Sequence, residues 1–219
     1  MTKFRAKSRI MIVDDHPMMR DGLTMRISSQ ADMEVCGDAA TENAAVELAK
    51  QLCPDLVLID ISVQEGNGIE LVKRIRLLNA TTKMLVVSTF QESLYAERAL
   101  RAGALGYLNK NESNEKLLEA IRTVLRGDRY VSAETTQRLV SQALGKHAVM
   151  DDPIETLTDR ELEVFRLIGD GVSTSAIAGQ LFLSTHTVDT HRENIKKKLG
   201  AKTGADLNRK AIQSMLENG

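Results

Sequence analysis

The chain has 219 residues, of which 42% are hydrophobic and 27% charged, and its formal net charge is −1. This length suits one large domain or two small ones, and the composition excludes a wholly disordered chain. No apolar run approaches the ~20 residues that a membrane-spanning helix needs, and the basic start lacks the apolar run of a signal peptide, so we expect a cytoplasmic protein with no membrane partner.

The first 127 residues alternate short apolar runs with segments of helical periodicity. Strand patterns lie at 9–14, 33–36, 55–60, 84–88 and 106–108. Helical patterns lie at 18–29, 41–52, 69–78, 94–102 and 115–126. Strands that alternate with helices form parallel sheets covered on both faces. We therefore predict that residues 1–127 form an α/β domain with a doubly wound, five-stranded parallel sheet.

Beyond Gly127 the strand pattern stops. Helical periodicity continues at 133–144, 158–169, 174–181, 185–199 and 206–216. We assign residues 128–154 to a linker with one helix, and residues 155–219 to a small all-α domain. Thr158 and Glu161 have the spacing of a capping box. The tight break between the second and third helices of the all-α domain predicts a helix-turn-helix.

Positive charge is concentrated in this C-terminal part, although the whole chain is nearly neutral. From Ser173 to Lys210 there are seven basic and three acidic residues, a local balance of +4. Such a surface attracts phosphates, and the N-terminus of a helix favours them further. A solvated charged face is the alternative. The predicted DNA-contacting residues are Ser184, Thr185, Thr187, Asp189, Thr190, Arg192, Glu193, Lys196 and Lys197.

Three further features concern packing. The two cysteines, Cys36 and Cys53, are too few for a disulfide framework or a four-ligand zinc site. We interpret them as reduced thiols in the core. His191 is interpreted as a packed structural residue rather than a metal ligand. In the last helix, Leu207, Ala211 and Met215 are spaced four apart, which fits a self-association face or the closure of a small core.

Three aspartates follow two of the most apolar strands. Asp14 and Asp15 end the first strand, and Asp60 ends the third. The carboxyl ends of parallel strands meet at one edge of the sheet, where converging carboxylates repel one another unless a hard cation such as Mg²⁺ lies among them. Taken alone, aspartates at strand ends are better interpreted as caps of a helix and a loop.

Ser88 and Lys110 favour a binding site over these capping roles. Ser88 ends the fourth strand and Lys110 follows the fifth, so both are expected at the same edge of the sheet. A hydroxyl and an ammonium beside a metal-bound carboxylate form an anion site that suits a phosphoryl group.

At these residues the chain resembles a known family. The motifs lie at 13–17, 55–60, 87–88 and 103–110, and then at 157–163, 177–178, 184–188, His191 and 198–199. In order and spacing they resemble a two-component response regulator of the NarL/LuxR type, which is a receiver domain followed by a LuxR-type helix-turn-helix domain. The resemblance extends over nearly the whole chain and implies a flavodoxin-like receiver.

The resemblance also implies roles for the receiver residues. Asp60 would accept a phosphoryl group from a sensor histidine kinase. Lys110 and Ser88 would bind the phosphoryl oxygens, and Tyr107 would follow Ser88 as an aromatic switch. From spacing alone, Tyr107 is a half-buried aromatic residue of an edge strand. The implied Mg²⁺ ligands are Asp15, Asp60 and the backbone carbonyl of Ser62, with Asp14 acting through water.

The resemblance implies a regulator and not an enzyme. Phosphorylation would rearrange the domains, favour a homodimer and promote binding to double-stranded promoter DNA. A protein-binding signalling module is one alternative, and a phosphohydrolase with Asp60 as nucleophile is another, although its usual second acid is replaced by Ser62. The chain departs from the family pattern in two places: Gln64 stands where proline is usual, and Asp189 stands where a basic residue is frequent, with Glu193 one turn later.

Overall fold

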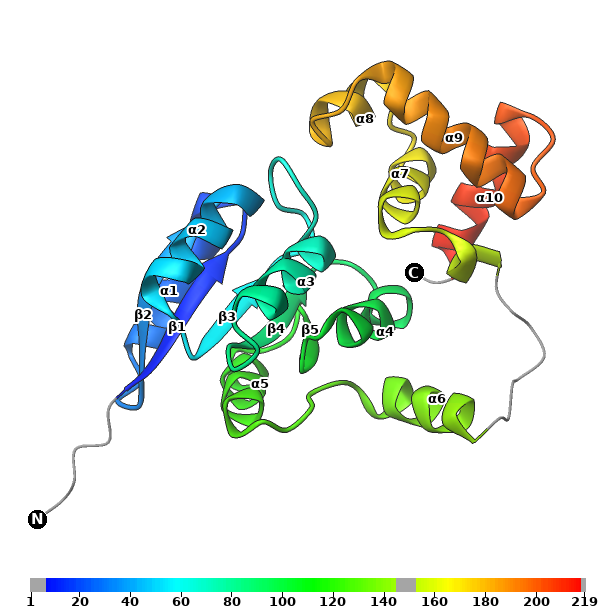
Figure 1. Ribbon diagram of the computed structural model, residues 1–219. Coiled ribbons are helices and arrows are strands. Elements are labelled where there is room, and N and C mark those ends of the chain that lie inside the picture. Colours follow the sequence, from blue (N-terminus) through cyan, green and yellow to red (C-terminus); the bar gives the residue numbers. More distant parts are fainter. Residues whose placement is uncertain (1–6, 145–152, 218–219) are drawn as a thin grey trace, which may run out of the picture. The chain divides into compact units, whose positions relative to one another are not determined.

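The computed structural model describes residues 7–144 and 153–217. Internal contacts divide the chain into two compact units, Met1–Val140 and Ser141–Gly219. The first contains the sheet and the second is helical (Figure 1). The domain borders at 127/128 and 154/155 remain predictions. No helix among the described residues is long and apolar enough to cross a membrane.

The first unit is a five-stranded parallel sheet with the order β2-β1-β3-β4-β5. Its strands are β1 (Ser8–Val13), β2 (Met33–Ala39), β3 (Leu56–Ile59), β4 (Lys83–Ser88) and β5 (Gly106–Asn109). Its helices are α1 (Pro17–Ser28), α2 (Glu42–Leu52), α3 (Gly68–Leu78), α4 (Glu92–Ala102), α5 (Asn114–Arg126) and α6 (Ala133–Ala143), the last of which ends just beyond the unit border. The predicted doubly wound sheet is confirmed.

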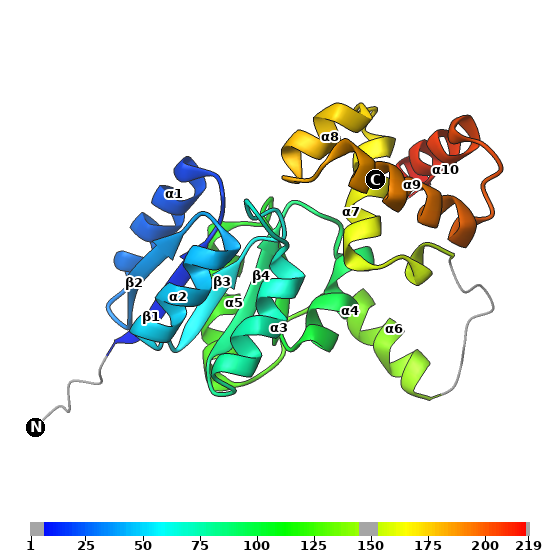
Figure 2. The same ribbon diagram turned by 45° about the horizontal axis from the view of Figure 1, so that its top comes forward.

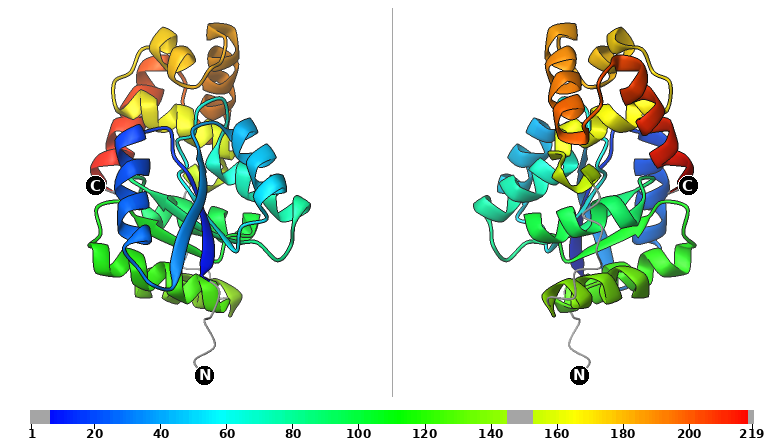
Figure 3. Two further views of the ribbon diagram at one scale, coloured as in Figure 1. Left: turned by 90° about the vertical axis from the view of Figure 1, so that its left-hand side faces the viewer. Right: turned by 90° about the vertical axis from the view of Figure 1, so that its right-hand side faces the viewer.

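Helices cover both faces of this sheet. Figure 3 shows α1 on one side of the strands and α2 and α3 on the other. Leu23 and Ile27 of α1 share a core with Ile121 and Val124 of α5 and with inward residues of every strand. All four residues of β3 are buried, which is why this strand reads as an unbroken apolar run.

Two details of this unit differ from the sequence-based expectations. The second strand extends to Ala39, because β1 pairs with it past a register shift between Ile10 and Met11. Its edge position permits polar residues, which hid its length in the sequence. Cys53 is exposed, so the prediction that both cysteines lie in the core is wrong for this residue. It caps α2 in a left-handed conformation, with a φ of 46°, where the chain turns at the surface.

In the second unit, the first element described beyond α6 is a 3₁₀ helix, Pro153–Thr156. Four α-helices follow (Figure 2): α7 (Asp159–Gly169), α8 (Thr174–Gln180), α9 (Thr185–Leu199) and α10 (Gly204–Glu217). The predicted capping box is confirmed, because Thr158 accepts from Glu161 N and Glu161 accepts from Thr158 N. Gly200, at a φ of 63°, ends α9, as a C-terminal glycine commonly does.

The last helix closes the core of this unit. Leu207 and Ala211 are fully buried. At Gly169 of α7, an added Cβ would lie 2.5 Å from Met215 Sδ and 3.0 Å from Ala211 O. This close approach places the Leu207–Ala211–Met215 row against α7, so the row closes the small core of this unit.

Candidate functional site

The three aspartates converge at the carboxyl ends of β1 and β3. These strands are neighbours in the sheet, and Asp60 N donates to Val13 O at 2.8 Å, which fixes the start of the loop after β3. Asp14 and Asp60 are 2% and 4% exposed. Carboxylate oxygens of Asp14, Asp15 and Asp60 lie with a nitrogen of His16 within 4.8 Å of one another.

Lys110 binds two of these carboxylates. Its Nζ lies 2.6 Å from Asp14 Oδ2 and 2.7 Å from Asp60 Oδ2, and its side chain is 6% exposed. Burial alone would lower the pKa of Lys110, but the charges and hydrogen bonds of Asp60 and Asp14 outweigh burial and raise it. Lys110 is therefore a fixed cation at the wall of the pocket.

One lysine does not neutralise the pocket. Among the described residues, the carboxylates of Asp14, Asp15 and Asp60 face a single ammonium, so two formal negative charges remain when His16 is neutral. Burial raises the pKa of Asp60, and Asp14 adds to this effect while Lys110 opposes it. Asp60 Oδ1 is buried and has no hydrogen-bond partner among the described residues. An unsatisfied carboxylate oxygen beside two further carboxylates fits a hard divalent cation such as Mg²⁺.

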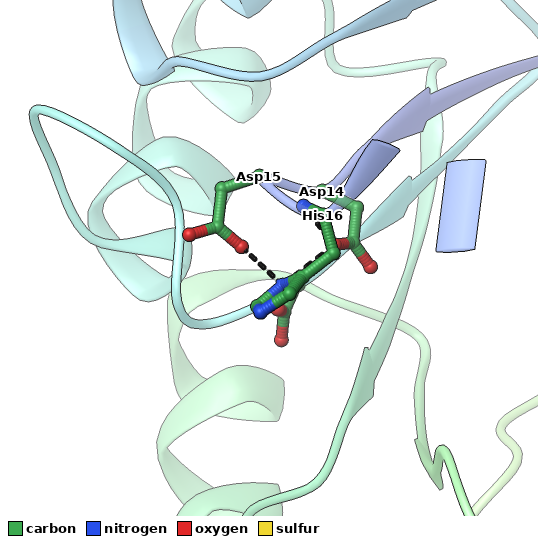
Figure 4. A group of neighbouring side chains, drawn as sticks. Asp14, Asp15 and His16 are labelled. Carbon is green, nitrogen blue, oxygen red and sulfur yellow. Dashed lines mark hydrogen bonds and ion pairs between the residues drawn. The ribbon is translucent and has the colours of Figure 1, made fainter. Parts of the chain in front are cut away.

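His16 belongs to this cluster, and the sequence reasoning did not assign it a role. In Figure 4 its ring lies against the carboxylates of Asp14 and Asp15. Its Nδ1 is 2.6 Å from Asp15 Oδ1 and 3.4 Å from Asp14 Oδ1, and the side chain is 69% exposed. The sequence feature that could have indicated this position is that His16 directly follows Asp14 and Asp15.

Ser88 and Tyr107 are connected to the same pocket. Ser88 is fully buried, and its hydroxyl acts to lower the pKa of Asp60, although burial of that carboxyl outweighs this effect. Ser88 Oγ also accepts from Phe90 N at 3.4 Å, and Phe90 O accepts from Tyr107 Oη at 2.8 Å. Burial raises the pKa of Tyr107.

The half-buried position that spacing suggested for Tyr107 is wrong, because the residue is 1% exposed. Although β5 is the last strand of the sheet, its edge is not open. Tyr107 N donates to Tyr130 O at 2.8 Å, and Tyr130 N donates to Leu105 O at 3.0 Å. The segment after α5 thus forms a short parallel bridge beside β5.

Ser62 lies half-buried in the loop between β3 and α3. This loop starts at Asp60, so it lies beside the acidic pocket. A role for the Ser62 carbonyl as a cation ligand stays a prediction.

The helix-turn-helix presents a second candidate site on α9. Its inward side is formed by Val188, Ile195 and Leu199, all buried. Of the predicted DNA-contacting residues, the exposed ones are Ser184, Thr185, Asp189, Thr190, Glu193 and Lys197, and the half-buried ones are Thr187, Arg192 and Lys196.

Several of these side chains already have partners. Ser184 Oγ caps the helix by accepting from Thr187 N at 3.0 Å. Lys196 Nζ lies 2.7 Å from Glu193 Oε1. His191 is half-buried, and burial lowers its pKa, as a packed structural residue requires.

Comparison with known proteins identifies both units. Residues 10–122 match the response regulator receiver domain, and residues 155–211 match the bacterial regulatory proteins of the luxR family. The oxygen regulatory protein NreC of Staphylococcus aureus is 37% identical over 213 residues, which cover 95% of this chain and 98% of that protein. This chain belongs to the LuxR-type response regulators.

Solved structures agree with this assignment. A LuxR-family two-component response regulator from Aurantimonas sp. SI85-9A1 aligns with a TM-score of 0.58 at 32% identity, over 64% of this chain and 99% of that one. RcsB of Salmonella enterica serovar Typhimurium has the same fold, with a TM-score of 0.63 at 22% identity over 93% of this chain and 97% of that one. The predicted function as a phosphorylation-dependent transcription regulator is confirmed at the level of the family.

Proposed function

We propose that Asp60 of this response regulator accepts one phosphoryl group from a sensor histidine kinase in the cytoplasm. The observation that supports this is the environment of its carboxylate. The side chain is buried, one oxygen is held by Lys110, and the other has no hydrogen-bond partner among the described residues. A carboxylate held in this way is a fixed nucleophile.

We further propose that Mg²⁺ is the cofactor of this site. Asp15, Asp60 and the Ser62 carbonyl would hold it directly, and Asp14 would do so through water. When bound, the cation offsets the charge of the carboxylates and of the phosphoryl oxygens.

Phosphoryl transfer to Asp60 breaks one bond and forms another. A carboxylate oxygen of Asp60 attacks the phosphorus of the phosphohistidine, the P–N bond breaks as the P–O bond forms, and the electron pair stays on the imidazole nitrogen, which then takes up a proton. Lys110, 2.7 Å from Asp60, is placed to bind a phosphoryl oxygen. The buried Ser88 hydroxyl binds a second phosphoryl oxygen, and Tyr107 follows its movement.

The output is binding to promoter DNA through α9. One of the similar structures is RcsB bound to promoter DNA in the presence of the phosphomimetic BeF₃⁻. By analogy, the hydroxyls at the start of α9 and its basic residues contact the DNA backbone. Phosphorylation favours a homodimer, whose two helices read two half-sites.

Incubation with Mg²⁺ and acetyl phosphate tests the proposal, with intact mass, oligomeric state and promoter affinity as readouts. We expect one phosphoryl adduct, a shift to dimer and tighter DNA binding that weakens steeply with salt. Asp60→Asn should show none of these changes. Asp55→Asn is the matched control, because Asp55 precedes the opposite end of β3 and bonds to Arg9 N, so its adduct should equal that of the wild type.

The same experiment separates the alternatives. An adduct without any gain in DNA affinity would favour a protein-binding signalling module. Continuous turnover of a simple phosphate ester would favour a phosphohydrolase, whereas we expect a stoichiometric label that is lost slowly. The absence of an adduct on the wild type would overturn the role of Asp60.

A further inference from the structure

One buried acid at the start of α2 holds the loop that follows the phosphoryl-accepting Asp60. Glu42 is 7% exposed. Its Oε2 accepts from Asn67 N at 3.1 Å, and its Oε1 accepts from Arg74 Nη1 at 2.6 Å. A carboxylate from one βα unit therefore binds the backbone of the loop between β3 and α3 and the helix that follows this loop.

The loop has no room for a side chain beside Glu42. A Cβ on Gly66 would lie 2.0 Å from Glu42 Oε2 and 2.6 Å from Glu42 Cβ. Glycine at this position thus lets the carboxylate lie directly against the loop backbone. The position of the Glu42 carboxylate therefore depends on the absence of a side chain at Gly66.

Backbone hydrogen bonds join the same two segments. Gln64 N donates to Ala40 O and Glu42 N donates to Gln64 O, both at 3.2 Å, and Thr41 and Gln64 form a parallel bridge. The family pattern has proline at position 64, and proline has no N–H to donate. This chain therefore replaces a stiff residue with a hydrogen-bonded connection between the loop and the start of α2.

Both ends of the loop are fixed as well. Gly68 N donates to Ile61 O at 2.9 Å, and Asn67 Oδ1 caps α3 by accepting from Ile69 N at 2.8 Å. Since Asn67 is the residue that Glu42 holds, the position of the cap and the path of the loop depend on this carboxylate.

We propose that Glu42 is a positioning residue of the phosphoryl-accepting site, which fixes residues 61–67 so that the Ser62 carbonyl faces the bound cation. This inference rests on the proposed function of Asp60. Glutamine cannot replace Glu42 fully, because it accepts through one oxygen only and presents its NH₂ to either Asn67 N or Arg74, both of which are donors.

Two variants of the full chain test this role through the same contact. Glu42→Gln removes one acceptor, and Gly66→Ala pushes the carboxylate away from the loop. Mg²⁺ affinity is measured by calorimetry, and the rate of phosphorylation by acetyl phosphate is measured at increasing Mg²⁺ concentrations. We expect each variant to bind Mg²⁺ about tenfold more weakly, as is usual when a group that orients a ligand is lost. We also expect the double variant to lose much less than the product of the two effects.

Rescue by the cation distinguishes positioning from general damage. If Glu42 acts by placing the Ser62 carbonyl, saturating Mg²⁺ restores the phosphorylation rate of both variants. Asp32→Asn is the control, because it breaks an exposed ion pair with Arg122 in the same unit and should leave Mg²⁺ affinity unchanged.

Wild-type Mg²⁺ affinity in Glu42→Gln would overturn the inference. A lower phosphorylation rate that saturating Mg²⁺ does not restore, accompanied by a lower Tm, would overturn it in favour of a purely structural role. If the wild type binds Mg²⁺ but takes up no phosphoryl group, the proposed function fails while the metal titration still decides the role of Glu42. If the wild type does not bind Mg²⁺, both fail.

Discussion

The acidic pocket of the receiver domain and the outer side of α9 hold their side chains in different ways. In the pocket, Asp14 and Asp60 are almost fully buried, and Lys110 lies within 2.7 Å of both. On α9, Glu193 is exposed and bonds to Lys196 one turn away on the same helix. The first site is assembled from distant strands, and the second lies on one element.

This difference sets what each site can do. Transfer of a phosphoryl group requires reacting atoms in a fixed geometry, and burial supplies it at the cost of desolvated charge. Attraction of DNA phosphates requires only positive charge on the exposed side of a helix. Solvent and salt screen this charge. Substitutions in the pocket should therefore alter stability strongly, whereas substitutions on α9 should alter DNA affinity with little effect on folding.

Matched glycine substitutions in the two units should show the largest contrast. At Gly68 an added Cβ would lie 2.1 Å from Asp60 O and 2.7 Å from Ile61 Cα. Gly68→Ala should therefore lower the free energy of unfolding of the receiver by about 3 kcal/mol. In α8, Gly179 has nothing within 4 Å of an added Cβ, and Gly179→Ala should raise stability by about 0.5–1 kcal/mol. Urea denaturation measures both, and equal losses in the two units would contradict the contrast.

The capping box of α7 gives the next largest effect, and it depends on pH. Burial opposes the charge of Glu161, but hydrogen bonds from Lys198 and Thr158 outweigh burial and hold its pKa below the usual 4.5. A lowered folded-state pKa gives stability that is present above 4.5 and is lost as the pH falls through the folded-state value. Glu161→Gln should cost about 1–2 kcal/mol at neutral pH.

Circular dichroism melts between about pH 7 and pH 3 measure this dependence. The variant should lose less stability than the wild type as the pH falls. Parallel curves for the two proteins would show that Glu161 does not contribute in this way.

Asp60→Asn should stabilise the receiver in the absence of divalent cations. Burial raises the pKa of Asp60 above 3.8, so the cost of its charge appears as the pH rises from 3.8 through the folded-state pKa and persists above it. Removing that charge should raise the free energy of unfolding at neutral pH by about 1 kcal/mol, which is a few degrees in Tm.

Calorimetric melts in EDTA and in Mg²⁺ check this expectation. The wild type should gain more from Mg²⁺ than the variant, because the variant has lost a ligand. A variant less stable than the wild type in EDTA would contradict the interpretation that uncompensated negative charge in the pocket destabilises the receiver.

The smallest effect on folding is expected on α9. Asp189 is exposed near the start of the helix, where its charge opposes DNA phosphates. Asp189→Lys should leave Tm unchanged, tighten DNA binding about fivefold at low salt, and steepen the dependence on salt by about one phosphate contact. Electrophoretic mobility shifts over a salt series measure this. Weaker binding with a change in preferred sequence would mean instead that Asp189 contacts a base.

Much of the fold was predictable, since its signals are local or repetitive. Apolar runs and helical periodicity predicted the alternation of strands and helices. The caps at Thr158 and Gly200 are contacts within one helical turn, so short stretches of sequence contain them. The length of β2 was missed, since its polar residues are stabilised by pairing with β1 rather than by their own pattern.

The candidate site was only partly predictable. Strand-end positions predicted that Asp14, Asp60 and Lys110 would meet. The burial of Tyr107 was not predicted, because its strand is covered by α4 and by Tyr130, which the pattern did not place there.

The sequence by itself determined the order of the elements, their caps and the membership of the LuxR-type response regulators, because these depend on neighbouring residues and on motif spacing. Only the tertiary structure decided which side chains touch: Lys110 reaches Asp60 across fifty positions, and Glu42 reaches Asn67 across twenty-five. Such contacts depend on the strand order and on the path of each loop, and both are fixed only when the whole core packs.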